Sequence, residues 1–123
     1  MIGSASSPVV LIVEDEAIIR VGAAALIEDL GCEFFEASSA DEAIALLEQH
    51  PQITILFTDI QMAGSMDGLE LAAYARRRWP PLQFIIVSGN HIATAIEMPE
   101  GACFFPKPYN AATIGEAIRA FVQ

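Results

Sequence analysis

The sequence predicts an α/β fold, in which a doubly wound, five-stranded parallel sheet is covered by helices. Short apolar runs alternate five times with segments whose apolar residues recur at helical spacing, which is typical of successive βαβ units. The first run, residues 8–13, is almost entirely apolar, as in a strand covered on both faces. We therefore expect strands at residues 8–13, 32–37, 53–58, 84–87 and 102–105.

The segments between these runs predict the helices. Gly31 stands where the first helix needs a C-cap, and residues 39–42 have the pattern of a capping box that opens the second. Residues 91–97 are only weakly helical, and Pro99 ends them. The apolar residues at helical spacing are Ile19, Ala23, Leu26 and Leu30, then Ala40, Ile44 and Leu47 facing inward, then Leu69, Ala72 and Ala73, and finally Ile114, Ile118 and Phe121.

The length of 123 residues fits one domain, residues 8–123, preceded by a flexible N-terminus at residues 1–7. No apolar run approaches the roughly 20 residues that cross a bilayer. The first residues lack the basic start and apolar centre of a secretion signal. We therefore expect a cytoplasmic protein with no membrane partner.

The composition is strongly acidic, with 16 Asp and Glu against 6 Lys and Arg and a net charge of −10. This charge repels nucleic acid, so we expect no direct nucleic-acid partner. The basic run at residues 76–78 fits a helix C-terminus. Cys32 and Cys103 lie in apolar sequence without metal-ligand spacing, where a cysteine behaves as a small core residue.

Polar side chains follow four of the predicted strands. Glu14 and Asp15 follow the first strand, Asp59 the third, Ser88 the fourth, and Lys107 the fifth. The ligands of open parallel sheets bind at the carboxyl ends of the strands. We therefore expect an acidic cluster, a hydroxyl and an ammonium at one edge of the sheet.

The acidic cluster indicates a divalent cation. If the first and third strands are neighbours, three carboxylates lie close together and cannot all stay ionised without a counter-ion. Oxygen ligands without histidine or thiolate favour Mg²⁺, which commonly completes its coordination with water and a substrate phosphate. Lys107 is the only lysine of the chain and lies between two prolines. We interpret it as the fixed cation of a phosphate-handling site.

Each residue also has a simpler interpretation. An aspartate that ends a strand is most often a cap or turn residue. The case for a functional Asp59 therefore depends on Glu14, Asp15 and Lys107, which we expect at the same edge of the sheet. Residues 88–90 alone are best interpreted as a turn. Phe104 is in the first place a core residue.

At these positions the sequence resembles the receiver domain of two-component response regulators. The match covers nearly the whole chain and rests on five short motifs in the expected order. They are Val-Glu14-Asp15-Glu, Thr58-Asp59-Ile-Gln-Met, Asp67-Gly68, Val87-Ser88-Gly89 and Lys107-Pro108.

The resemblance implies a flavodoxin-like sheet with strand order 2-1-3-4-5. In that order Cys32 and Cys103 lie on opposite edge strands, too far apart for a disulfide. The resemblance also implies a cis peptide bond between Lys107 and Pro108.

It further implies the roles of the site residues. Asp59 is phosphorylated by a histidine kinase, and Lys107 contacts the phosphate. Ser88 is the switch hydroxyl that turns to a phosphoryl oxygen, and Phe104 is the aromatic residue that follows it inward. The Mg²⁺ ligands are the side chains of Glu14, Asp15 and Asp59 and the backbone carbonyl of Gln61.

Two features depart from the family pattern. Ala63 stands where proline is usual, in a loop that is one residue longer before Asp67. The segment between Ser88 and Lys107 is short, so we expect a short or weak fourth helix. We expect phosphorylation to act by ordering or shifting residues 91–100.

Three classes of function fit these residues. The first is a phospho-accepting switch of a phosphorelay, which takes its phosphoryl group from a histidine kinase or a histidine phosphotransfer protein and signals to a downstream protein target. It is no enzyme beyond promoting its own phosphorylation and dephosphorylation. The second is an Mg²⁺-dependent phosphohydrolase with an aspartyl-phosphate intermediate, which commonly needs a second acid where Gln61 stands. The third is a receiver-like interaction module that is never phosphorylated.

Overall fold

The structure is a computed structural model that describes residues 7–89 and 99–122. Five parallel strands form one sheet in the order β2-β1-β3-β4-β5, as expected. The strands are β1 (Val9–Val13), β2 (Glu33–Ala37), β3 (Ile55–Asp59), β4 (Gln83–Ser88) and β5 (Cys103–Pro106). The helices are α1 (Ala17–Asp29), α2 (Ala40–Gln49), α3 (Gly68–Arg78) and α4 (Ala111–Phe121).

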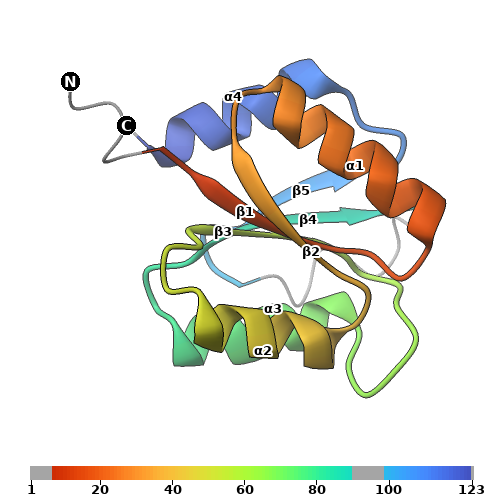
Figure 1. Cartoon of the computed structure of the whole chain (residues 1–123), viewed down its shortest axis with the longest axis vertical. Coiled ribbons are helices and arrows are strands. Elements are labelled where there is room, and N and C mark those ends of the chain that lie inside the picture. The colour runs from red at the N-terminus through yellow and green to blue at the C-terminus, as the bar shows by residue number, and fades with distance from the viewer. Residues whose placement is uncertain (1–6, 90–98, 123) are drawn as a thin grey trace.

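The molecule has three layers, with α1 and α4 on one face of the sheet and α2 and α3 on the other (Figure 1). Side chains alternate between the two faces along each strand. In β1, Leu11 and Val13 belong to the core beneath α2 and α3, whereas Val10 and Ile12 belong to the core beneath α1 and α4. The central strands β1 and β3 are buried along their whole length, because helices cover both of their faces.

Most predicted inward positions are confirmed, with one correction in α1. Ala40 and Leu47 are buried, and Ile114 and Ile118 anchor α4. The buried residues of α1 are Ala23, Ala24 and Ile27, while Ile19 is exposed. The predicted stripe was therefore displaced around the helix, because the small Ala24 gave a weak signal of burial.

The capping box predicted at the start of α2 is only half formed. The Ser39 hydroxyl accepts a hydrogen bond from the Glu42 amide at 3.1 Å, but the Glu42 carboxylate accepts from Ser38. A complete capping box opens α3 instead, where Asp67 and Glu70 each accept a hydrogen bond from the other's backbone amide. Gly31 follows α1 with a φ of 85°, as its predicted capping role requires.

Two expectations that came from the family resemblance are confirmed. Cys32 and Cys103 are free, and the Lys107–Pro108 peptide bond is cis. The predicted weak helix at residues 91–97 and most of the flexible N-terminus lie outside the described residues, as does most of the segment expected to respond to phosphorylation.

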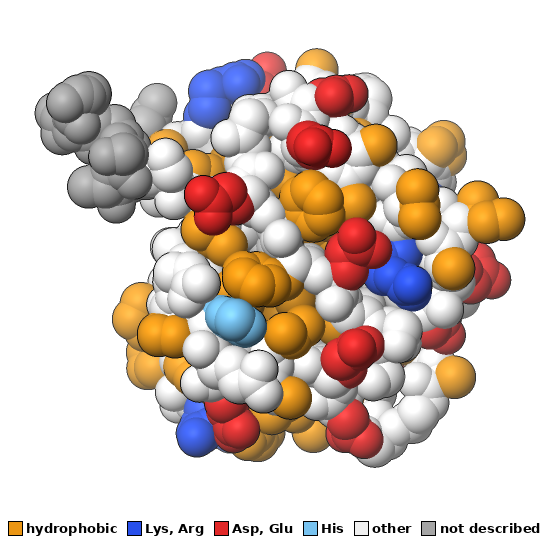
Figure 2. Space-filling model, viewed as in Figure 1, with side chains coloured by type: hydrophobic (Ala, Val, Ile, Leu, Met, Phe, Trp, Pro, Cys, Tyr) orange, Lys and Arg blue, Asp and Glu red, His pale blue; other side chains and the backbone are white. Residues whose placement is uncertain are grey.

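The surface carries the acidic charge in scattered positions. Figure 2 shows acidic side chains spread across one face, with hydrophobic side chains between them. In the part of the chain that the structure describes, no helix is both long and apolar enough to span a bilayer.

Candidate functional site

Sheet register brings the predicted site residues together at the carboxyl ends of the strands. Val13 of β1 pairs with Thr58 of β3, so the next residue along each strand, Glu14 and Asp59, lie side by side. Ser88 pairs with Pro106, and the Lys107 amide donates a hydrogen bond to the Ser88 carbonyl at 2.9 Å. Residues far apart in the sequence therefore meet because parallel strands end at the same edge.

Three charged side chains are in direct contact at this edge. The Lys107 ammonium lies 2.6 Å from Asp59 Oδ2 and 3.4 Å from Glu14 Oε1. Asp59 and Glu14 are buried, with only 5% and 4% of their surface exposed. The lysine thus bridges two carboxylates that are largely removed from water.

The environment shifts the protonation equilibria of this cluster. Burial, reinforced by the neighbouring Asp59 carboxylate, raises the pKa of Glu14 to about 7. Burial by itself would lower the pKa of Lys107, but the Asp59 and Glu14 carboxylates outweigh burial and raise it. Lys107 therefore stays charged at neutral pH, while Glu14 can exchange a proton there.

Asp15 and Asp59 hold the same loop from two sides. Asp59 Oδ1 accepts a hydrogen bond from the Gln61 amide at 3.2 Å, and Asp15 Oδ2 accepts one from the Ala63 amide at 3.1 Å. The loop after β3, which has Ala63 in place of the usual proline, is thereby fixed between two of the predicted metal ligands. Asp15 itself is exposed, so water reaches this side of the site.

The donor set suits Mg²⁺ in its chemistry. Over residues 7–89 and 99–122, no three acidic, histidine or cysteine side chains form a complete ligand group by themselves. Mg²⁺ does not require one, because it keeps several waters and is usually held by one or two carboxylates. Asp15, Asp59 and the Gln61 carbonyl on the loop between them offer oxygen atoms only, which fits that preference.

Ser88 and Phe104 lie on the sheet face that is covered by α2 and α3. The fully buried Ser88 hydroxyl donates a hydrogen bond to Gln61 Oε1 at 3.1 Å. Phe104 pairs with Ile86, which precedes Ser88 by two residues along β4, and packs into the same core as Ile86. The two predicted switch residues are therefore neighbours on one face, although Phe104 is only partly buried.

Gly68 has a steric role that our interpretation of the sequence did not assign. A Cβ at Gly68 would lie 2.7 Å from the Asp59 carbonyl carbon and would overlap the carbonyl oxygen. Only glycine lets the start of α3 approach the backbone of Asp59 this closely. The signal was the glycine that directly follows the N-cap Asp67.

Our interpretation of the sequence also gave no role to Thr58 or Arg20. The buried Thr58 hydroxyl donates to the Asp59 carbonyl at 3.0 Å. Arg20 Nη1 donates to the Glu14 carbonyl at 2.8 Å. Neither contact has a sequence signal, because each depends on the direction of a side chain.

An apolar hollow of about 450 Å³ borders the charged cluster. It is lined by Ile19, Lys107, Pro108 and Tyr109. On the same helix as Ile19, Ile18 is 88% exposed and Val21 is 62% exposed. Large exposed aliphatic side chains beside a polar site are typical of surfaces that contact another protein.

Comparison with known proteins assigns the family. The sequence model of the response regulator receiver domain matches residues 10–119. The chain belongs to this family. The match includes every predicted site residue.

Individual relatives agree with this assignment. The chain is 31% identical over 121 residues to the sensor kinase CckA of Brucella abortus, covering 95% of the chain and 13% of that protein. It is 37% identical over 107 residues to the nitrogen assimilation regulatory protein NtrX of Azorhizobium caulinodans, covering 83% of the chain and 23% of that protein. This receiver chain thus spans less than a quarter of the length of either relative.

Solved structures share the fold. Response regulator TrrA of Thermotoga maritima, solved in complex with Mg²⁺ and BeF, superposes with a TM-score of 0.84 at 22% identity, covering 93% of this chain and 98% of that one. At this identity the similarity shows the fold alone.

Proposed function

We propose that this receiver domain is a phospho-accepting signalling switch of a phosphorelay and that Asp59 is its acceptor. The observation that carries the proposal is the Asp59 carboxylate itself, which is buried at the end of β3 with the Lys107 ammonium 2.6 Å away. An aspartate that served only as a cap or turn residue would not need a partly buried ammonium group as its partner.

The transfer is a nucleophilic displacement at phosphorus. An Asp59 carboxylate oxygen attacks the phosphorus atom of a phosphohistidine, a P–O bond forms, and the P–N bond breaks. The bonding electron pair leaves on the imidazole nitrogen, which takes up a proton. Lys107 stays beside the transferred group and stabilises the negative charge on its oxygens.

The side chains of Glu14, Asp15 and Asp59 and the Gln61 carbonyl would hold Mg²⁺. When bound, the ion supplies the charge neutralisation that lets an anionic phosphoryl group approach these carboxylates. The chain prepares this site by fixing the loop between Asp15 and Asp59 with two backbone amides.

We expect the Ser88 side chain to transmit the phosphorylation of Asp59 to the sheet. Its hydroxyl is bonded to the Gln61 side chain, and a phosphoryl oxygen on Asp59 is a stronger, charged acceptor for the same donor. When the hydroxyl turns towards the phosphoryl group, the space available to Phe104 on the same face of the sheet changes. The residues that follow Ser88 lead to residues 91–100, the segment that we expect phosphorylation to order or shift.

The partners are a histidine kinase or histidine phosphotransfer protein upstream and a protein target downstream. The exposed apolar residues of α1 beside Lys107 offer an incoming donor protein a contact surface. The relative CckA is named a sensor kinase and NtrX a regulatory protein, which is consistent with a place between kinase and target. We place the domain in the cytoplasm.

Incubation with a small phosphodonor such as acetyl phosphate, with and without Mg²⁺, tests the proposal. Intact-mass spectrometry should show one phosphoryl group in the presence of Mg²⁺, and peptide mapping should place it on Asp59. The Asp59→Asn variant should take up none, whereas Asp29→Asn, an exposed aspartate at the end of α1, should label like the wild type.

This experiment, together with an assay on a phosphate ester, separates the alternatives. A wild-type chain that never becomes labelled would indicate a pure interaction module. Rapid multiple turnover of a phosphate ester would indicate a phosphohydrolase. A phosphate mapped to another residue would refute Asp59 as the acceptor.

A further inference from the structure

Arg20 links the acidic turn to the edge of the sheet. It lies in α1, one helical turn after the N-cap Glu16, and only 21% of its side chain is exposed. Its Nη1 atom donates to the Glu14 carbonyl at 2.8 Å, and its Nε atom donates to Glu36 Oε1 in β2 at 3.2 Å. One side chain thus fastens the turn between β1 and α1 to the neighbouring strand.

The side chains of this turn are bonded as well: the Glu14 carboxylate contacts Lys107 and accepts from the Glu16 amide at 3.1 Å, and Asp15 accepts from the Ala63 amide. Its backbone, in contrast, has few attachments to other elements. Glu14 is the first residue beyond β1, and its amide still donates to the Ala37 carbonyl of β2 at 3.1 Å. Its carbonyl, the next backbone acceptor, is bonded by Arg20. The N-cap Glu16 caps α1 with no side-chain hydrogen bond, so the helix start does not fix the turn in that way.

The Glu14 carbonyl belongs to the peptide group that joins Glu14 to Asp15. Because a peptide group is planar, holding its oxygen also fixes the amide nitrogen of Asp15. The Asp15 Cα atom belongs to the same plane, so the held peptide limits where the Asp15 carboxylate can lie. The Asp15 carboxylate in turn reaches across to the Ala63 amide at 3.1 Å, beside the loop that Asp59 holds.

We propose that Arg20 is a positioning residue for the divalent-cation site, an inference that rests on the proposed function. By holding the Glu14–Asp15 peptide, Arg20 aims the Asp15 carboxylate at the loop after Asp59 before the cation arrives. Glu36 acts one step further out and holds the guanidinium in place. Such outer partners of metal ligands commonly change metal affinity by about 10- to 100-fold when they are removed.

The chemistry of the two contacts requires arginine. A guanidinium is planar and presents several N–H donors in a fixed fork, so it can address a carbonyl and a carboxylate in two directions at once. Lysine is a single point charge on a flexible stem and would hold one acceptor at a time. The proposal therefore predicts a graded loss of cation affinity, smaller for Arg20→Lys than for Arg20→Met.

Calorimetric titration with MgCl₂ tests the proposal directly on the unphosphorylated chain. We expect Arg20→Met to raise the Kd for Mg²⁺ by about 10-fold or more, and Arg20→Lys to give an intermediate value. Glu36→Gln should have a smaller effect, because the bond to the Glu14 carbonyl remains. Arg78→Met is the matched control, since Arg78 also pairs with a glutamate, Glu48 at 3.3 Å, but does so at the C-terminal end of α3.

The rate of labelling by acetyl phosphate provides a second measurement. For Arg20→Met, the Mg²⁺ concentration at half-maximal rate should rise with the Kd, whereas the rate at saturating Mg²⁺ should stay within about threefold of the wild type. A general loss of structure would lower the saturating rate and the unfolding midpoint together. The two effects are thereby distinguished.

Each outcome decides the matter. A Kd for Arg20→Met within twofold of the wild type, or a Kd change equal to that of Arg78→Met, would overturn the positioning role and leave the proposed function intact. If Arg20→Met does not fold, Arg20→Lys and Glu36→Gln carry the same comparison. A wild-type chain that neither binds Mg²⁺ nor takes up label would overturn both proposals.

Discussion

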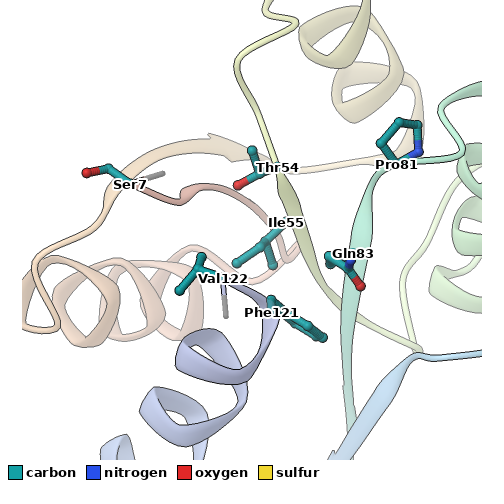
Figure 3. Close-up of a pocket in the computed structure, with 7 residues that line it drawn as sticks. All are labelled: Ser7, Thr54, Ile55, Pro81, Gln83, Phe121 and Val122. Atoms are coloured by element: carbon teal, nitrogen blue, oxygen red, sulfur yellow. The ribbon is translucent and has the colours of Figure 1, made fainter. Parts of the chain in front are cut away.

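At the carboxyl ends of β1, β3 and β5, charged side chains contact one another, whereas the hollow at the starts of β3 and β4 is lined by neutral ones. Glu14 and Asp59 share the Lys107 ammonium at the first end. At the opposite end, a hollow of about 270 Å³ lies between the strand starts and the end of α4 (Figure 3). Its lining residues are Ser7, Thr54, Ile55, Pro81, Gln83, Phe121 and Val122.

The contrast separates the end of the sheet whose contacts stabilise the fold from the end that carries the reactive groups. At the start of β3, the Thr54 hydroxyl accepts from the Val9 amide at 3.1 Å and joins two strands. At the end of the same strand, Asp59 is buried beside another carboxylate, an arrangement that costs stability unless a cation offsets it. Substitutions at the two ends should therefore have separable effects on folding and on phosphorylation.

The largest effect is expected at Gly68. Gly68→Ala places a methyl group against the Asp59 backbone, which has to shift, and should lower the free energy of unfolding by roughly 3 kcal/mol or more. The control Gly22→Ala adds a methyl with no atom within 4 Å in the middle of α1 and should raise stability by about 0.5–1 kcal/mol. Urea denaturation of both variants measures this, and equal effects would contradict the close approach.

Lys107→Met tests the charged end itself. Loss of the ammonium should slow labelling of Asp59 by roughly 100-fold, because the transferred oxygens lose a fixed cation in a partly buried site. Gln83→Met, at the hollow, should label at the wild-type rate. Circular dichroism checks that both chains are folded, and a Lys107→Met rate within threefold of the wild type would remove the lysine from the chemistry.

The raised pKa of Glu14 predicts how stability depends on pH. Between the ordinary pKa of about 4.5 and the folded value of about 7, the folded chain binds more protons than the unfolded chain, so Glu14 makes stability fall as pH rises. Glu14→Gln should remove this component, which at about 1.4 kcal/mol per pKa unit amounts to roughly 2–3 kcal/mol between pH 5 and pH 8. Denaturation at pH 5 and pH 8 without Mg²⁺ compares the two chains, and parallel pH profiles would refute the prediction.

The smallest effect is expected at the hollow. Thr54→Val keeps the shape of the side chain but leaves the Val9 amide without its acceptor, which should cost about 1 kcal/mol of unfolding free energy. Labelling of Asp59 should remain within twofold of the wild type. A labelling defect larger than the stability loss would show that the two ends are coupled.

The sequence was sufficient for the backbone arrangement and for the edge at which the site lies. Apolar runs marked β1, β3 and β4 to within a few residues, because burial on both faces demands continuous hydrophobic sequence. The edge strands β2 and β5 were located as well, although β2 contains Glu33 and Glu36 and neither strand is fully buried. The strand order and the cis bond before Pro108 followed from the family motifs. Asp59 and Lys107 were expected to meet because both follow strands of a parallel sheet.

What could not be predicted depends on side-chain direction. The Glu42 carboxylate accepts from Ser38 and not from the Ser39 amide, a choice between neighbours that the same sequence pattern allows. The bond from Ser88 to Gln61 and the bond from Arg20 to Glu14 cross between elements and depend on rotamers. Gly68 was part of a recognised motif, but its steric role became apparent only from the position of α3.

The only tryptophan of the chain, Trp79, stands directly after the last residue of α3, with the Arg78 guanidinium 5.0 Å from its ring centroid. The first residue of that helix, Gly68, touches the backbone of Asp59. A helix of 11 residues is roughly 16 Å long, so the indole lies well away from the charged cluster. Its fluorescence therefore reports on the end of α3 that is remote from Asp59. A change in emission on labelling would indicate that α3 moves as a rigid body. A constant emission would indicate that the response is limited to the strand ends and their loops.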